Sequence, residues 1–212
     1  RDAVIFGVEN QSIALAHQLT KNNWQVRMVT SIENFVEKYP ELNIVVVKSL
    51  SKPDLKILNL DLTEAAILML DDNRNLEIAT LIFEHFGTKD IIVRLNERIN
   101  FDKFHKLGAK IIDPSTAIVS LLDHFVRSPN ATTLLLGMDK GQDSIDIEIL
   151  NKDIAGLRLR DLRLPSDVIM LSLKRRGQFI ISHGYTLLRV GDIVTLVGSN
   201  KSLEDLKTKF SN

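Results

Sequence analysis

Short apolar runs alternate with helix-like patterns over the first half of the chain, and this alternation constrains the fold more than any other feature of the sequence. Six runs of three to five residues are rich in Val, Ile and Leu, as buried strands are: residues 3–6, 25–29, 44–47, 66–70, 91–94 and 110–112. Apolar side chains at helical spacing lie between them, at residues 12–21, 73–86 and 101–107. The sequence therefore predicts a doubly wound α/β domain, a parallel sheet with helices on both faces.

Residues that begin or end helices stand at the borders of these patterns. Gly87 and Gly108 follow two of the helices, where glycine closes a last turn in the left-handed conformation. Asp72 and Asn100 stand at the starts of the same helices, and we expect them to accept hydrogen bonds from the free helix amides. The pair Asp71 and Asp72 also lies at a strand end, where open α/β sheets bind ligands, but capping is the favoured role.

A change of pattern after Pro114 predicts a second domain. Residues 115–126 form a helical pattern whose apolar surface is broad enough to pack on more than its own sheet: Ile118, Val119, Leu122, Phe125 and Val126. Residues 127–143 contain a proline, two glycines and few periodic positions, so we place the domain boundary there. The predicted domains are residues 1–136 and 137–212.

The predicted second domain has the pattern of a small α+β module. Isoleucines alternate with acidic residues over 145–149, which is typical of a half-buried strand. Apolar runs at 168–173 and 179–181 flank an Arg-Arg-Gly turn and predict a hairpin. A further strand is predicted at 193–197, followed by a closing helix with an apolar face: Leu203, Leu206 and Phe210.

The composition excludes several classes of function. The chain has 27 basic and 27 acidic residues, so it lacks the surplus of positive charge that nonspecific nucleic-acid binding requires. It has no cysteine, which excludes disulfides, a thiol nucleophile and a cysteine zinc site. No run approaches the roughly 18 apolar residues of a membrane helix, so we expect no membrane insertion. The first residue is Arg1 rather than Met, which favours a segment of a longer chain.

Motifs for catalysis are missing from the sequence. It contains no G-x-S-x-G elbow, no H-E-x-x-H helix and no G-x-x-x-x-G-K-[ST] phosphate loop. The five histidines stand far apart without ligand spacing, so we assign no catalytic and no metal residue. We therefore expect a protein that is not an enzyme.

The turn after the first strand is the most informative motif. A dinucleotide-binding fold carries G-x-G-x-x-G there, and this chain keeps only Gly7, with Glu9 at the second glycine position and Ser12 at the third. At an effective dielectric of about 20, repulsion between a carboxylate and a phosphate about 4 Å apart costs roughly 4 kcal/mol of binding free energy. Even a third of that energy lowers the affinity about tenfold. The second strand ends in Thr30 and Ser31, which cannot grip a ribose diol bidentately as a carboxylate does.

Short motifs along nearly all of the chain resemble the RCK family, the regulator-of-potassium-conductance domains also called TrkA-N plus TrkA-C. The matching pieces are Pro-Asp-Leu-Lys-Ile at 53–57, Leu-Asp-Asp-Asn-Arg-Asn-Leu at 70–76, Val-Arg-Leu-Asn at 93–96, Leu-Gly-Ala at 107–109, Ile-Asp-Pro at 112–114, Ile-Ala-Gly-Leu at 154–157, Leu-Arg-Leu-Pro at 162–165, Gly-Tyr-Thr-Leu-Leu at 184–188 and Val-Gly-Asp at 190–192. The resemblance implies a Rossmann-like doubly wound parallel sheet followed by a small α+β TrkA-C module. It also implies dimerisation through the helix and crossover after the sixth strand.

In many members of this family the first lobe binds NAD(H) or an adenine nucleotide, and in some the second lobe binds a small ligand at a dimer interface. Carried over by position, the nucleotide pocket would be walled by Gly7, Glu9, Asn10, Thr30, Lys48, Ser49, Asp71 and Arg94. The pocket is degenerate, because the family's Gly-Asp-Ala-Thr stretch reads Lys-Ser-Leu-Ser at 48–51. Arg94 either meets a phosphate or pairs with Glu9 or Asp71, and pairing is the favoured role. Glu9 and Thr30 disfavour NAD or adenine nucleotide as the cofactor.

The resemblance implies a regulatory domain of a monovalent-cation transporter or channel, of K⁺ or of the Na⁺/H⁺ antiporter kind. We expect it at the cytoplasmic face of the membrane, as a homodimer or higher oligomer, with the membrane transporter domain in the same or a separate chain. One alternative is a free-standing NAD- or ATP-binding regulator of K⁺ uptake. A nucleotide-dependent oxidoreductase is less favoured, because it needs an intact phosphate turn and a proton donor.

Overall fold

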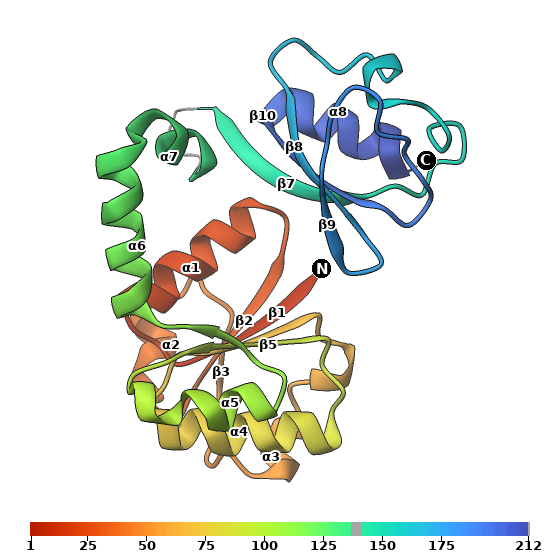
Figure 1. Cartoon of the computed structure of the whole chain (residues 1–212). Coiled ribbons are helices and arrows are strands. Elements are labelled where there is room, and N and C mark those ends of the chain that lie inside the picture. The colour runs from red at the N-terminus through yellow and green to blue at the C-terminus, as the bar shows by residue number, and fades with distance from the viewer. Residues whose placement is uncertain (137–140, 212) are drawn as a thin grey trace. The chain divides into compact units, whose positions relative to one another are not determined.

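The structure, a computed structural model, describes residues 1–136 and 141–211 and divides into two compact units, Arg1–Val119 and Ser120–Asn212 (Figure 1). The division falls inside helix α6, Pro114–Arg127, which is earlier than the predicted boundary segment. The predicted border between residues 136 and 137 adjoins residues 137–140, which lie outside the described residues, so it stays a prediction.

The first unit is built on a six-stranded sheet in the order β3-β2-β1-β4-β5-β6, and all its strand pairs are parallel. Its strands are β1 (Asp2–Phe6), β2 (Gln25–Thr30), β3 (Ile44–Val46), β4 (Ala65–Leu68), β5 (Asp90–Arg94) and β6 (Lys110–Ile112). Its helices are α1 (Asn10–Lys21), α2 (Asn34–Lys38), α3 (Lys52–Lys56), α4 (Asp72–His85) and α5 (Phe101–Lys106), with short 3₁₀ helices at Leu60–Leu62 and Arg98–Asn100. This confirms the predicted doubly wound fold, whose strand order reverses between β1 and β4.

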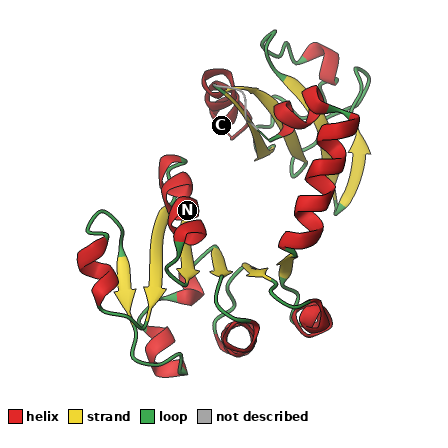
Figure 2. Cartoon of the chain, turned by 90° about the vertical axis from the view of Figure 1, so that its left-hand side faces the viewer, coloured by secondary structure: helices red, strands yellow, loops and turns green. Residues whose placement is uncertain are grey.

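Alternate residues of the inner strands enter two separate hydrophobic cores, because side chains along a strand point to opposite faces. Ala3 and Ile5 share one core with Ala16 of α1, whereas Val4 and Phe6 share the other with helix α4 and its neighbours. Figures 1 and 2 show helices on both sides of the sheet. A strand covered on both faces is apolar at every position, which is why the strands of this unit were readable as continuous runs.

The helix ends of the first unit bear out part of the predicted capping. Gly87 and Gly108 have positive φ angles of 61° and 68°, as the left-handed closing turn requires. The N-cap of α4 is Asp71, one residue before the predicted Asp72, and its carboxylate accepts from the Arg74 amide at 3.1 Å. The capping predicted for Asn100 is wrong, because its side-chain amide donates to the Asp72 carboxylate instead.

The second unit contains a four-stranded antiparallel sheet in the order β7-β10-β8-β9. Its elements are α7 (Pro129–Leu135), β7 (Gln142–Glu148), a 3₁₀ helix (Leu159–Asp161), β8 (Ile169–Arg175), β9 (Gln178–Ile181), β10 (Ile193–Ser199) and α8 (Asn200–Ser211). The predicted apolar face of α8 is buried in the core of this unit through Leu203, Leu206 and Phe210. The hairpin turn has positive φ at Arg176 and Gly177, which matches the twist of the strands it joins.

Helix α7 lies where the sequence predicts only a linker. Pro129 is its first residue, a position at which the missing amide proton costs nothing and the fixed φ favours a helix start. The Thr132 amide and hydroxyl both bond to the Ser128 carbonyl, at 3.0 and 2.9 Å. The proline that was interpreted as a breaker therefore begins a helix.

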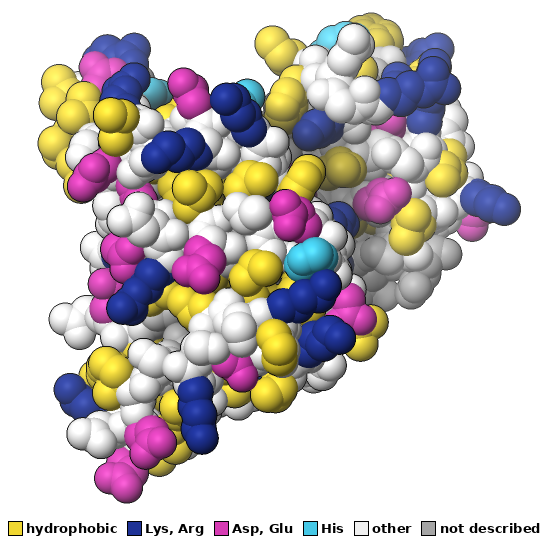
Figure 3. All heavy atoms as spheres, turned by 90° about the horizontal axis from the view of Figure 1, so that it is seen from below, with side chains coloured by type: hydrophobic (Ala, Val, Ile, Leu, Met, Phe, Trp, Pro, Cys, Tyr) yellow, Lys and Arg dark blue, Asp and Glu magenta, His cyan; other side chains and the backbone are white. Residues whose placement is uncertain are grey.

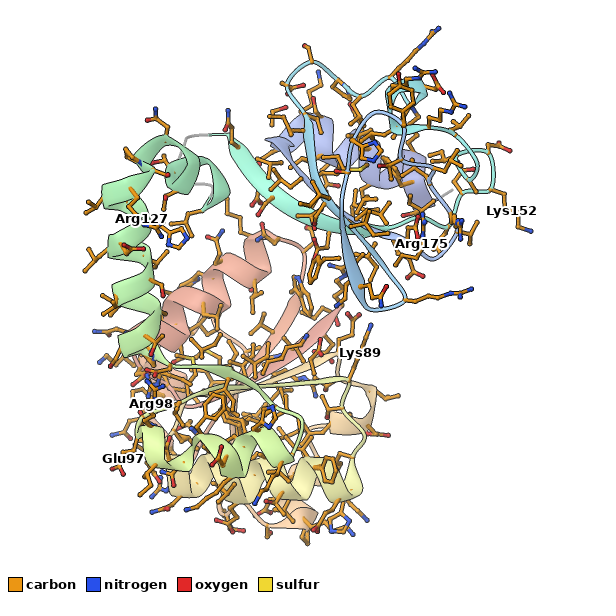
Figure 4. The ribbon with its side chains drawn as sticks, viewed as in Figure 1. Lys89, Glu97, Arg98, Arg127, Lys152 and Arg175 are labelled. Carbon is orange, nitrogen blue, oxygen red and sulfur yellow. The ribbon has the colours of Figure 1, made fainter. Side chains whose placement is uncertain are left out.

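A buried ion pair holds the second unit together. Arg175 donates to both carboxylate oxygens of Asp192, at 2.8 and 2.7 Å, and to the Leu187 carbonyl at 2.7 Å (Figure 4). Asp192 is 1% exposed, and burial alone would raise the pKa of its carboxyl. The Arg175 hydrogen bonds and the Arg189 amide outweigh burial and lower that pKa. The pair therefore ties the hairpin to the start of β10.

Charged side chains of both signs are interspersed with hydrophobic ones on the face shown in Figure 3. Such a surface matches a formal net charge of zero. In residues 1–136 and 141–211, no helix is both long enough and apolar enough to cross a membrane.

Candidate functional site

A pocket of about 410 Å³ lies at the carboxyl ends of β1, β2 and β3, beside the point where the strand order reverses. Open α/β sheets bind ligands at this edge. Eight apolar side chains form much of its wall: Phe6, Val8, Val29, Ile32, Phe35, Val47, Leu50 and Leu70. Six polar or charged ones complete it: Thr30, Ser31, Lys48, Ser49, Arg74 and Glu77.

The pocket brings together half of the site residues that the family resemblance implies. Gly7, Thr30, Lys48 and Ser49 line it, whereas the other four lie outside its lining: Glu9, Asn10, Asp71 and Arg94. Sequence reasoning missed Ile32, Phe35, Arg74 and Glu77. Arg74 lies within the family piece at 70–76, which carries no sign of a pocket role, and no local motif marks the other three. Only the strand order brings α4 next to the ends of β2 and β3.

Gly7 is required by its backbone and by its surroundings. Its φ is +111°, a conformation that side chains other than glycine rarely adopt. A Cβ atom at this position would lie 3.2 Å from Leu70 Cδ2 and 3.4 Å from the Met69 carbonyl oxygen. The tight turn of a nucleotide-binding fold is thus retained.

Glu9 and Arg94 form an ion pair at the start of α1. Glu9 is the N-cap of this helix, and its backbone amide donates to the Ser12 hydroxyl at 2.8 Å. Arg94, at the end of β5, donates to the Glu9 carboxylate and also to Gln11 Oε1 at 3.2 Å and the Met69 carbonyl at 2.8 Å. The predicted pairing of Arg94 is therefore with Glu9, while Asp71 pairs with Arg74 at 3.4 Å. The protein's own carboxylate and counter-ion stand where a phosphate would approach the helix.

A buried carboxylate fixes the strand ends beside this pair. Asp72 is 7% exposed and accepts from the backbone and side-chain amides of Asn96, the Glu97 amide and the Asn100 side chain, at 2.8 to 2.9 Å. Burial alone would raise its pKa, but these donors outweigh burial and lower it. Asn75 joins the Leu70 amide and carbonyl at 3.0 and 2.9 Å. The ends of β4 and β5, and with them Arg94, are thereby held in place.

In the loop after β3, Ser49 is hydrogen-bonded within the loop, whereas Lys48 forms no ion pair with a described residue. The Ser49 amide and hydroxyl both donate to the Asp54 carboxylate, and the hydroxyl bond is the main cause of the lowered pKa of Asp54. Ser49 is therefore already occupied. Among the described residues, no carboxylate lies within ion-pair distance of the exposed Lys48 ammonium. The Thr30 hydroxyl accepts from the Ile32 amide at 3.2 Å and keeps its own proton to donate.

Nothing in the described part of the chain groups three or more His, Asp or Glu side chains to hold a metal ion. No histidine lines the pocket. Its titratable groups are Lys48, Arg74 and Glu77, which suit recognition of a charged ligand.

Comparison with known proteins identifies both units. The TrkA-N domain family matches residues 3–114, and the TrkA-C domain family matches residues 146–211. A Trk system potassium uptake protein TrkA homologue of Archaeoglobus fulgidus is 27% identical over 98% of this chain and 49% of its own length. The putative Na⁺/H⁺ antiporter YjbQ of Bacillus subtilis is 24% identical over 95% of this chain and 33% of its own length.

The human SLO3 gating ring is similar in fold, with a TM-score of 0.66 at 13% identity over 97% of this chain and 46% of that chain. The chain thus spans half or less of the length of these relatives. With one family match on each unit, and the TrkA-N match alone covering more than half of the chain, this protein belongs to the TrkA-N and TrkA-C domain family, the RCK domains.

Proposed function

We propose that this chain is the regulatory, non-catalytic part of a monovalent-cation transport system and acts at the cytoplasmic face of the membrane. The observation that carries the proposal is the succession of TrkA-N and TrkA-C domains over nearly the whole chain. The relatives named above are a potassium uptake protein and a putative Na⁺/H⁺ antiporter, which supports cation transport as the regulated process. The membrane transporter domain lies in the same polypeptide or in a partner.

The proposed regulator works as a dimer or higher oligomer through α6. This helix exposes five large apolar side chains, and the most exposed are Val126 at 85% and Val119 at 67%. Ile118, Leu122 and Val126 recur every four residues and therefore lie along one face. Apolar stripes of this kind mark association surfaces, and a second copy of the chain is the partner that the family implies.

A ligand in the pocket would regulate transport by binding one arrangement of the units more tightly than another. A difference in binding free energy of about 1–3 kcal/mol between the two arrangements is enough for useful coupling. The pocket is suited to this role, because it gathers the ends of three strands and the start of α4.

Cation flux in everted membrane vesicles tests the proposal. Vesicles that contain the intact transport protein are compared with vesicles whose protein lacks residues 1–212. K⁺ or Na⁺ is added to both, and a fluorescent dye reports the pH gradient. We expect the deletion to change the ion or ligand dependence of transport while flux persists. Unchanged flux and unchanged ion dependence would contradict the regulatory role. Light scattering on residues 1–212 separately tests the dimer, and a monomer at tens of micromolar would overturn it.

A second candidate is a free-standing regulator of K⁺ uptake that binds NAD or ATP. Another TrkA homologue, from Methanothermobacter thermautotrophicus, supports this candidate. It is 20% identical over 98% of this chain and 98% of its own length. The second candidate requires a pocket that accepts a 5′-pyrophosphate, which the Glu9–Arg94 pair opposes.

A further inference from the structure

The pocket described above carries Lys48 at one end, and the Glu9–Arg94 pair lies just outside its lining at the other, directly after Gly7 and Val8. Glu9 stands at the end of β1, and Lys48 stands beyond the end of β3. In the sheet order β3-β2-β1, these two ends are two strand spacings apart, about 10 Å at the usual spacing of about 4.8 Å. A ligand that extends from Lys48 past Gly7 and Val8 would therefore approach the Glu9–Arg94 pair outside the lining.

The β1 end offers little to an anion. The Arg94 guanidinium already donates to Glu9, Gln11 and the Met69 carbonyl. Its charge is matched by the Glu9 carboxylate, which is 42% exposed. A phosphate placed there would have to displace a carboxylate from its partner and approach the helix start past the Glu9 side chain.

The β3 end has the opposite character. Lys48 is exposed and lies beyond ion-pair distance of every described carboxylate. Asp54, whose pKa the Lys48 charge helps to lower, is held by Ser49 and Ser51. Thr30 keeps a hydroxyl proton to donate, and no acidic residue stands at the end of β2, where a carboxylate would repel a phosphate on the sugar. The remaining pocket charges, Arg74 and Glu77, are of opposite sign.

Part of the pocket lining is apolar. Ile32, Phe35 and Leu50 belong to it and provide surfaces on which a flat ring could pack. Ile32 is 52% exposed, so a ring that covers it gains by removing apolar area from water.

From this layout we infer that the pocket binds a nucleotide whose phosphate is on the 3′ oxygen of the sugar and faces Lys48, rather than a 5′-nucleotide whose phosphate faces α1. The inference deepens the proposed function and rests on it for the purpose of the site. Lys48 and Thr30 would bind the phosphate, and the Glu9–Arg94 pair would stay intact beneath the 5′ hydroxyl.

Isothermal titration of the whole chain with nucleoside monophosphates tests this inference. The probes are the 3′-monophosphates of adenosine, guanosine, cytidine and uridine and their four 5′ isomers. We expect at least one 3′ isomer to bind about tenfold more tightly than its 5′ isomer, the ratio that one charge-assisted hydrogen bond provides. Lys48→Ala should abolish the preference. Lys52→Ala, which removes an exposed lysine of the neighbouring helix outside the pocket lining, should preserve it.

Equal affinities for the isomers, a preference for 5′ isomers, or no binding below millimolar would each overturn the inference. So would a preference that Lys48→Ala leaves intact. The flux assay separates this failure from failure of the proposed function. A chain that regulates flux without isomer preference overturns only the ligand inference, and one that binds 3′ isomers without any effect on flux overturns only the regulatory role.

Discussion

Each unit of the molecule contains an arginine–carboxylate pair, and the two pairs differ in burial and geometry. In the second unit, Arg175 meets Asp192 with two nitrogens, and the carboxylate side chain is 2% exposed. In the first unit, Arg94 meets Glu9 with one nitrogen, and the Glu9 side chain is 42% exposed. The same kind of ion pair thus stabilises the fold in the second unit and lies beside the candidate site in the first.

The difference teaches where each pair acts. A buried pair that loses one partner leaves an uncompensated charge in a medium of low dielectric, so its integrity decides whether the unit folds. A half-exposed pair contributes little to stability, because water solvates either partner alone. The half-exposed pair instead affects the binding of a charged ligand that approaches it.

Replacing Asp192 should produce the largest loss of stability. Asp192→Ala leaves Arg175 and the Arg189 amide without their acceptor, and we expect the free energy of unfolding of the second unit to fall by about 3 kcal/mol. Hydrogen exchange of the β8 and β10 amides measures this unit by itself. A loss below about 1 kcal/mol would show that the pair does not hold the second unit together as described above.

Replacing Asp72 should cost the first unit somewhat less. Asp72→Asn keeps the size but turns an amide nitrogen toward two of the four donors around the carboxylate, so we expect a loss of about 2 kcal/mol. The only tryptophan of the chain, Trp24, lies in this unit, and its fluorescence during urea unfolding reports the change. An unchanged midpoint would contradict the proposed anchoring of the β5 end.

Acid should weaken both units through the same two carboxylates. The pKa values of Asp72 and Asp192 are lowered by folding, so each carboxylate contributes stability that is present above the ordinary value of 3.8. That stability is lost as the pH falls through the lower folded-state pKa. Asp192→Asn should flatten the acid dependence of the second unit, as followed by hydrogen exchange. A pH dependence equal to that of the native protein would contradict this assignment.

Replacing Glu9 should have the smallest effect on stability. Glu9→Gln removes an ion pair that is partly solvated, so we expect a change in the free energy of unfolding within about 0.5 kcal/mol. Trp24 fluorescence in urea measures it. A loss as large as that of Asp72→Asn would make Glu9 a structural residue and remove the contrast between the two pairs.

Much of the fold was predictable because its buried and half-buried strands have clear hydrophobic patterns in the sequence. The buried strands of the parallel sheet are continuous apolar runs, and β7 alternates as a half-buried strand does. The helices α2, α3 and α7 were missed because their five to seven residues show no clear apolar spacing, whereas Phe101 and Phe104 mark one face of the equally short α5. The role of Asp72 was also missed, since its partners lie 24 to 28 residues farther along the chain.

The candidate site was predictable only where a local motif marks it. Gly7 and the residues after β2 and β3 were readable from the resemblance to the family. The choice of Glu9 over Asp71 as the partner of Arg94 depends on distances between strands that are far apart in sequence. The same holds for the approach of Arg74 to the pocket, which follows from the position of β4, the strand that leads into α4, beside β1.

The central claim is that Glu9, paired with Arg94, excludes a 5′-pyrophosphate from the first turn. Calorimetric titration of the native chain and of Glu9→Gly with NADH and ADP tests it directly, with Glu84→Gln as a control of equal charge at the far end of α4. We expect no micromolar binding to the native chain or the control, and a gain of at least about tenfold in the variant, whose glycine is tolerated at an N-cap. Micromolar binding of either nucleotide to the native chain would contradict the claim.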